Sequence, residues 1–208
     1  MSKLGSEENP LKVAIVGAGP SGFYAADALI NSDLKVEVNL LEKLCAPYGL
    51  VRTGVAPDHP LIKKSIEKFA VMAEPEAFNY FGNVSVGKDI TVDELKETHH
   101  AVIITMGAET DRKLGIPGED LKGSHTATEF VAWYNGHPEY REREFDLSHE
   151  TAVIIGQGNV AADVARILSK TVDELKCTDI SQHALDVLET SKVKNIYIVG
   201  RRGPAQGA

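Results

Sequence analysis

Val13-Ala14-Ile15-Val16-Gly17-Ala18-Gly19-Pro20-Ser21-Gly22 is an apolar run that ends in three spaced glycines, and residues 23–29 continue it with a helical pattern. This order predicts a buried parallel strand, a tight turn and the first turn of a helix. Gly17 would permit the turn, Gly19 would let a pyrophosphate approach the backbone, and Gly22 would let the helix pack closely on the strand. The N–H groups of the first helical turn would then face the negative charge of a ligand.

An acidic residue follows the next predicted strand, residues 36–41. Glu42 lies about 25 residues after Gly17, where its carboxylate could accept hydrogen bonds from a ribose. Glycines alone would also fit an ordinary strand–helix turn. Together with the strand, the helix and the acid at this distance, they predict a dinucleotide-binding unit.

The composition is that of a soluble globular protein, with 208 residues of which 43% are hydrophobic and 25% charged. This length allows one sizeable core or two modest ones, and no apolar run approaches membrane-spanning length. The net charge of −8 argues against a nucleic-acid partner, because binding to phosphates requires a basic footprint. We therefore expect neither nucleic acid nor a membrane among the partners.

The two cysteines, Cys45 and Cys177, lie far apart and form no CxxC pair or metal-ligand cluster. This usage fits a reducing compartment and argues against a dithiol relay, a cysteine-ligated iron–sulfur cluster or another metal site within this chain. Residues 1–10 show neither a signal-peptide core nor an Arg-rich presequence. The expected location is the cytoplasm.

Two irregular segments organise the middle of the chain. Residues 47–60 are too rich in glycine and proline for a helix or a regular strand, and residues 114–118 are expected to form an irregular crossover. We place the domain boundary at the crossover that contains residues 114–118 and divide the chain into domains 1–107 and 108–208. The other expected elements are a helix over 61–73, short strands over 79–87, a helix opened by the capping box Thr91–Glu94, a strand over 101–105, a helix over 127–134 and an exposed loop over 135–149.

The opening pattern returns near residue 152. Residues 152–155 predict a strand, and Gly156-Gln157-Gly158-Asn159-Val160-Ala161 predicts a second glycine turn that opens a helix. An insertion of mixed helical character follows over 172–189. The next strand, 195–199, ends in Gly200-Arg201-Arg202 rather than in an acid.

The residues that follow the second strand differ between the two halves. A carboxylate there suits a free ribose, whereas guanidinium groups suit a ribose 2′-phosphate. The first half is therefore predicted to bind a dinucleotide such as FAD, and the second NADPH. Two such sites imply electron transfer from one cofactor to the other, although a solvated turn would also account for Arg201 and Arg202.

Three segments, residues 47–60, 156–166 and 201–206, resemble the adrenodoxin-reductase type of ferredoxin–NADP reductase, flavoproteins related to glutathione reductase. The resemblance covers essentially the whole chain. It implies an α/β fold with two Rossmann-like dinucleotide-binding domains built on parallel sheets, FAD on 1–107 and NADP on 108–208. Members of this family are more than twice as long, so we expect both domains to be incomplete here.

The resemblance also implies cofactor-binding roles at matching positions. FAD would be bound by Gly17, Gly19, Ser21 and Gly22 at its pyrophosphate, Glu42 at its ribose, Leu50 near the flavin and Val86 at the adenine. NADPH would be bound by Gln157, Gly158, Asn159 and Val160 at its pyrophosphate and by Arg201 and Arg202 at its 2′-phosphate.

His59 and Asp163 match a histidine and an aspartate that meet near the flavin in this family, where a proton relay has been considered. An imidazole beside a carboxylate can pass protons and tune a neighbouring redox centre. The alternative is structural: His59 would hold down a loop, and Asp163 would occupy a helix face.

The function implied is an FAD-dependent oxidoreductase that accepts a hydride from NADPH and passes single electrons to a ferredoxin-like iron–sulfur protein. Another flavoprotein reductase, such as a glutamate synthase subunit, is the alternative within the fold, and the absence of CxxC argues against a thioredoxin reductase. A nucleotide-binding module without catalysis is the alternative outside the enzymes.

An acidic ferredoxin would need a local basic patch. The candidate positions are Arg52, Lys63, Lys64, Lys68, Arg201 and Arg202. The three lysines could equally form the solvated face of a helix.

Overall fold

The computed structural model describes residues 2–108, 110–203 and 205. The chain divides into two compact units: unit 1 comprises Met1–Arg52 and Leu61–Glu109, and unit 2 comprises Thr53–Pro60 and Thr110–Ala208. Residues 53–60, called the strap below, therefore group with unit 2 although they lie in the first third of the sequence. Among the described residues no helix is long and apolar enough to cross a membrane.

Unit 1 is built on a parallel sheet in the order β3-β2-β1-β4. Its strands are β1 (Leu11–Val16), β2 (Val36–Glu42), β3 (Phe78–Gly82) and β4 (Ala101–Ile104). Because the strand order reverses between β1 and β4, their carboxyl ends border the crevice where this class of fold binds ligands. The first glycine turn follows β1 and lies at that edge.

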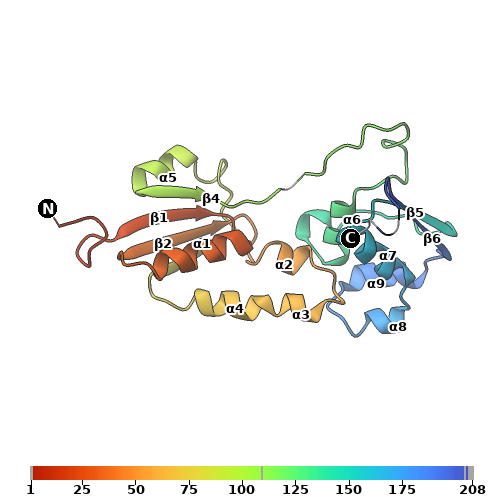
Figure 1. The fold of residues 1–208 in the computed structure, drawn as a ribbon, viewed down its shortest axis with the longest axis horizontal. Helices are drawn as coiled ribbons and strands as arrows, with labels where there is room; N and C mark the ends of the chain where they lie inside the picture. Colours follow the sequence, from red (N-terminus) through yellow and green to blue (C-terminus); the bar gives the residue numbers. More distant parts are fainter. Residues whose placement is uncertain (1, 109, 204, 206–208) are drawn as a thin grey trace. The chain divides into compact units, whose positions relative to one another are not determined.

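Helices cover both faces of this sheet (Figure 1). On one face, α1 (Pro20–Ile30) and α4 (Ser65–Met72) bury Phe23 and Phe69 against Val13 and Ile15. On the other face, α5 (Val92–Thr98) buries Leu95 in a smaller apolar cluster. Both layers follow from the near-continuous apolar run of β1, whose alternate residues face opposite sides.

Unit 2 combines a parallel strand pair with a helical core. Its elements are α6 (Ala127–Tyr134), β5 (Thr151–Ile155), α7 (Asn159–Ser169), α8 (Val172–Leu175), α9 (Gln182–Glu189) and β6 (Asn195–Val199). Trp133, Tyr134 and Ile167 are among the most buried side chains. The strand pair and α7 position the second glycine turn in the same way that β1, β2 and α1 position the first.

Most predicted elements are confirmed, including the two strand–turn–helix units, the Thr91 capping box and the helix 127–134. Three expectations were wrong. Residues 50–53, expected to be irregular, form α2 (Leu50–Thr53), because burial of Val51 outweighs the local composition. The helix 61–73 is divided at Lys64 into α3 (Pro60–Lys63) and α4.

The third error concerns residues 135–149, which were expected to be an exposed loop. They contain a short 3₁₀ helix, η1 (Pro138–Tyr140), and Phe145 is buried. The Phe145 ring lies 5.0 Å from Phe130 and 4.9 Å from Trp133, centroid to centroid. The aromatic contacts hold this polar segment onto the core of unit 2.

Candidate functional site

The first glycine turn joins β1 to α1 through two positions that tolerate no side chain. Gly17 has φ +106°, and a Cβ there would lie 2.6 Å from the carbonyl oxygen of Thr105. A Cβ on Gly22 would overlap the carbonyl oxygen of Gly17. The Gly17 N–H donates to the carbonyl of Leu41 at 2.8 Å, which ties the turn to the end of β2.

Gly19 is different, because the fold itself leaves room for a side chain there. Gly19 precedes α1 with φ −81° and ψ −177°. Because glycine has no side chain, it cannot cap the N-terminus of this helix with a side-chain hydrogen bond. The nearest atom to an added Cβ is the Cα of Gly49, at 4.0 Å. Ser21, in the first turn of α1, is exposed. The N-terminus of α1 is thus uncapped and accessible, as an anion site requires.

Glu42, at the end of β2, contacts the turn directly. One carboxylate oxygen accepts the Ala18 N–H at 2.8 Å, and the other accepts the Leu44 N–H at 3.1 Å. Each oxygen has a second lone pair with which it could accept a ribose hydroxyl. The acid therefore orders the glycine turn as well as lying beside it, a contact that the sequence analysis missed.

The segment Tyr48-Gly49 crosses the same turn. The Tyr48 N–H donates to the carbonyl of Ala18 at 2.8 Å, and Tyr48 has φ +90°, which is unusual for a residue with a side chain. A Cβ on Gly49 would lie 2.9 Å from the Cα of Gly19. Leu50 begins α2 immediately afterwards, and 69% of its surface is exposed.

Val86 lies apart from these residues. It forms an isolated bridge with Ile90, and its half-buried side chain packs against the cluster that contains Val16 and Leu95. The structure thus uses this side chain in the core of unit 1, and a ligand would have to meet the Val86 backbone.

The second glycine turn repeats the construction of the first. Gly156 has φ +133°, and its N–H donates to the carbonyl of Val199 at 2.8 Å, as that of Gly17 does to Leu41. Gly158 precedes α7 with φ −85° and ψ 176°, close to the values at Gly19. A Cβ on Gly158 would meet no atom within 4 Å. The two turns therefore present equivalent backbone surfaces.

Side chains around the second turn come from the ends of β5 and β6. Gln157 lies against Gly200, where an added Cβ would overlap the glutamine side chain. Asn159 begins α7, and Val160 is half-exposed. Arg201 and Arg202 are exposed, and within the described residues neither forms an ion pair. The predicted phosphate-binding groups thus follow the carboxyl ends of this strand pair.

A polar cluster links the strap to α7 within unit 2. Arg166 donates from Nε to Oδ2 of Asp58 at 2.5 Å and from Nη2 to Oδ1 of the same carboxylate at 2.8 Å. Nη2 also reaches Oδ1 of Asp163 at 2.8 Å, and Nζ of Lys170 reaches Oδ2 of Asp58 at 2.7 Å. His59 Nε2 lies 3.3 Å from Oδ1 of Asp163. The cluster therefore contains both residues of the predicted His–Asp pair.

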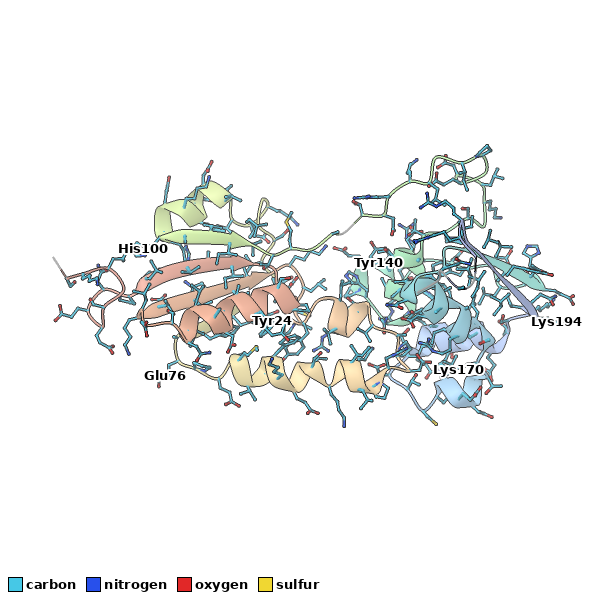
Figure 2. All side chains as sticks on the ribbon, in the orientation of Figure 1. Tyr24, Glu76, His100, Tyr140, Lys170 and Lys194 are labelled. Carbon is cyan, nitrogen blue, oxygen red and sulfur yellow. The ribbon has the colours of Figure 1, made fainter. Side chains whose placement is uncertain are left out.

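Sequence reasoning found His59 and Asp163 but missed the other three members. For two of these the signal in the sequence was spacing: Arg166 and Lys170 follow Asp163 by three and seven residues, which places Arg166 on the Asp163 face of α7 and Lys170 at its C-terminal end. Lys170, labelled in Figure 2, directly follows Ser169, the last residue of α7. The hydrogen bond from Arg166, assisted by Lys170, holds the pKa of Asp58 well below its usual range despite the opposing effect of burial.

Comparison with known proteins agrees with this arrangement. Residues 11–200 match the family model described as pyridine nucleotide-disulphide oxidoreductase. The chain belongs to this family.

The relatives within the family confirm the resemblance to the adrenodoxin-reductase type. NADPH:adrenodoxin oxidoreductase of Salvelinus fontinalis is 56% identical over 197 residues, covering 95% of this chain and 40% of the relative. NADPH-ferredoxin reductase FprA of Mycobacterium leprae is 52% identical, covering 94% and 44%. The structure of Mycobacterium tuberculosis FprA in complex with NADPH superposes with a TM-score of 0.93 at 51% identity, covering 96% and 45%. The two-domain dinucleotide-binding fold is confirmed, and the chain spans less than half the length of these relatives.

The first prediction concerns the contribution of Asp58 to the stability of the fold at acid pH. Because the folded-state pKa of Asp58 is depressed, its ion pairs stabilise the fold above the unfolded-state pKa of about 4 and are lost as the pH falls further. We expect Asp58→Asn to lower the free energy of unfolding by about 2 kcal/mol at neutral pH. That difference should shrink below about pH 4 in urea titrations at a series of pH values. A difference independent of pH would contradict the assignment.

The second prediction concerns Tyr134, which is fully buried in the core of unit 2. Its hydroxyl has no hydrogen-bond partner in the described structure, and burial raises its pKa far above the usual range. Removing an unpartnered hydroxyl costs no hydrogen bond, so Tyr134→Phe should change the free energy of unfolding by less than about 0.5 kcal/mol or increase it. Chemical denaturation tests this. A loss above about 1 kcal/mol would reveal a bond to the hydroxyl, such as one through a buried water.

Proposed function

We propose that this chain provides the FAD-binding and NADPH-binding regions of a reductase that accepts a hydride from NADPH and passes electrons to a ferredoxin-type iron–sulfur protein. One observation carries the proposal. Two glycine turns of equivalent backbone geometry are followed by opposite charges, Glu42 at the end of β2 and Arg201-Arg202 after β6. The names of the relatives, NADPH:adrenodoxin oxidoreductase and NADPH-ferredoxin reductase, support the same activity.

The residues of unit 1 fit a flavin dinucleotide. The uncapped N-terminus of α1 would bind the pyrophosphate through Ser21 and the backbone beside Gly19, where an added Cβ would fill open space. The remaining lone pairs of Glu42 would accept ribose hydroxyls. Leu50, exposed at the start of α2, would supply an apolar contact to the flavin-side segment.

The residues of unit 2 fit a 2′-phosphorylated dinucleotide. The backbone of Gly158 and the first turn of α7 would bind its pyrophosphate. The two exposed arginines after β6 would hold the 2′-phosphate, because planar guanidinium groups match phosphate oxygens. When both cofactors are bound, the nicotinamide supplies the hydride and the flavin supplies the means of passing electrons on.

We assign His59 and Asp163 to the region near the flavin. In the folded chain, His59 can donate its Nε2–H to Asp163, so the pair can hold a proton at that nitrogen. Such a group can tune a redox centre without taking part in hydride transfer, which needs no protein acid or base. This role requires the strap to hold His59 next to Asp163.

The proposed partner is an acidic ferredoxin that docks on a local basic patch. The net charge of −8 means that long-range attraction has to come from a few positions. Lys68 lies over the ring of Tyr24, at 4.9 Å from its centroid, and Tyr24 is labelled on α1 in Figure 2. That contact gives Lys68 a structural use, and Arg201 and Arg202 are assigned to the 2′-phosphate, so the docking proposal rests more on the exposed Arg52 and Lys64.

We further propose a reducing compartment, in keeping with the two free cysteines. The cytoplasm is our expectation, and the mitochondrial location in the name of the Salvelinus relative is the alternative. Subcellular fractionation would distinguish the two.

The proposed function can be tested on the purified chain. After incubation with FAD and removal of unbound flavin, the protein should show a bound-flavin absorption spectrum that bleaches under anaerobic NADPH much faster than under NADH. Uptake of both nucleotides without bleaching would favour a binding module without catalysis. Absence of any nucleotide binding would contradict the proposal.

A further inference from the structure

Arg166 holds two carboxylates from separate segments of the chain at once. Its guanidinium makes two hydrogen bonds to Asp58 of the strap, 108 positions away, and one to Asp163 of its own helix. Because the guanidinium is planar and rigid, the placement of one carboxylate constrains the other. A lysine could carry the same charge but could not reproduce this bridge.

The charges of the cluster balance without His59. The carboxylates of Asp58 and Asp163 face two cationic groups, the guanidinium of Arg166 and the ammonium of Lys170. Burial, and then the charges of the two carboxylates, raise the pKa of Tyr134 on α6. Asp163 thus already has a cationic partner. The position of His59 therefore depends on the strap as well as on its 3.3 Å contact with Asp163.

Burial is graded across the cluster. The Asp58 side chain is 5% exposed, whereas the His59 side chain is 38% exposed. Asp58 therefore anchors the strap, and the neighbouring His59 remains open to a ligand. A backbone hydrogen bond within the strap runs from the His59 N–H to the Ala56 carbonyl, and the Asp58 side chain ties the strap to Arg166 and Lys170.

We propose that Arg166 is a positioning residue that acts through Asp58 and Asp163 to place His59. This rests on the proposed function, because the placement of His59 matters for turnover only if the His59–Asp163 pair works beside a cofactor. The anchoring itself is a property of the apoprotein and can be measured without any cofactor.

The first test measures hydrogen exchange in the apoprotein by mass spectrometry, on peptides that cover residues 53–60. We expect Arg166→Lys and Asp58→Asn each to speed exchange of the strap by about tenfold or more, since local opening sets the rate. Lys194→Met, which removes a cation paired with Glu150 elsewhere in unit 2, is the matched control and should leave the strap unchanged. Unchanged exchange in both cluster variants would overturn the proposal.

Two cluster variants are used because Arg166→Lys could fail to fold. Asp58→Asn leaves the contact between Arg166 and Asp163 in place and releases only the strap. Circular dichroism identifies variants that retain the fold, and only these are compared. Exchange that rises no more in the strap than in the rest of unit 2 would mean that Arg166 is merely structural and would also overturn the proposal.

The second test is kinetic and uses the FAD-loaded chain with NADPH and an artificial electron acceptor. Arg166→Lys should lower kcat by about tenfold while changing the KM for NADPH less than threefold, because small displacements of a working group cost turnover more than binding. In a His59→Ala background the same change should have little further effect, since both act through one residue. Additive losses would contradict positioning. A wild-type chain that binds no cofactor would count against the proposed function, while the exchange test would still decide the anchoring.

Discussion

Replacing Gly22 with alanine is expected to unfold unit 1. The added Cβ would overlap the carbonyl oxygen of Gly17 and would lie 3.2 Å from Cδ1 of Leu40. The backbone oxygen can move away only if α1 separates from β1, which would expose the main core of the unit. We expect a loss of at least about 3 kcal/mol in the free energy of unfolding, measured by urea denaturation, and loss of FAD binding with it.

Gly19→Ala is the matched control, three residues away in the same turn. Its Cβ would have 4.0 Å of clearance, and its φ of −81° suits any residue. The variant should keep the stability of the wild type within about 1 kcal/mol but bind FAD at least about tenfold more weakly, because its methyl would occupy the surface that a pyrophosphate approaches. Equal stability of the Gly22 and Gly19 variants would contradict the packing described here.

Replacing Arg201 and Arg202 together with alanine should weaken NADP⁺ binding by about 100-fold, since hydrogen bonds between charged groups contribute roughly 1.5–3 kcal/mol each. Binding of NAD⁺, which lacks the 2′-phosphate, should change by less than about threefold. Calorimetric titration of the purified chain measures both nucleotides directly. An equal loss for both would remove the assignment of these arginines.

The control for this double variant is Lys192→Ala with Lys194→Ala. It changes the net charge by the same amount at the opposite end of β6, where Lys194 pairs with Glu150 and the Lys192 N–H bonds to Leu147. It should leave the preference for NADP⁺ over NAD⁺ intact. If the control lowered that preference as much, general electrostatics rather than a 2′-phosphate site would explain the result.

The parts of the fold that could be predicted are those that local sequence determines. The turns at Gly17 and Gly156 require glycine because φ is positive, and the strands beside them are recognisable as apolar runs. Residues 50–53 and Phe145 were misjudged because tertiary burial, which local composition does not reveal, decided their structure.

In the candidate site, too, local sequence predicted some residues and tertiary contacts determined others. Gly19, Glu42 and the arginines after β6 lie at fixed distances from recognisable turns, so spacing was enough to select them. The contact of Gly49 with Gly19 and the bridge from Arg166 to Asp58 join segments far apart in sequence. The helical spacing of Asp163 and Arg166 indicated one face of α7, but nothing in the sequence pointed to Asp58 as its partner.

Two equivalent glycine turns are proposed to bind two different dinucleotides. Calorimetric titration of FAD and NADP⁺ into the wild-type chain, Gly19→Ala and Gly158→Ala tests this proposal most directly, because the structure has room for a Cβ at both positions. We expect Gly19→Ala to lose FAD and keep NADP⁺, and Gly158→Ala to lose NADP⁺ and keep FAD. A variant that loses both, or a wild-type chain that binds neither, would contradict it.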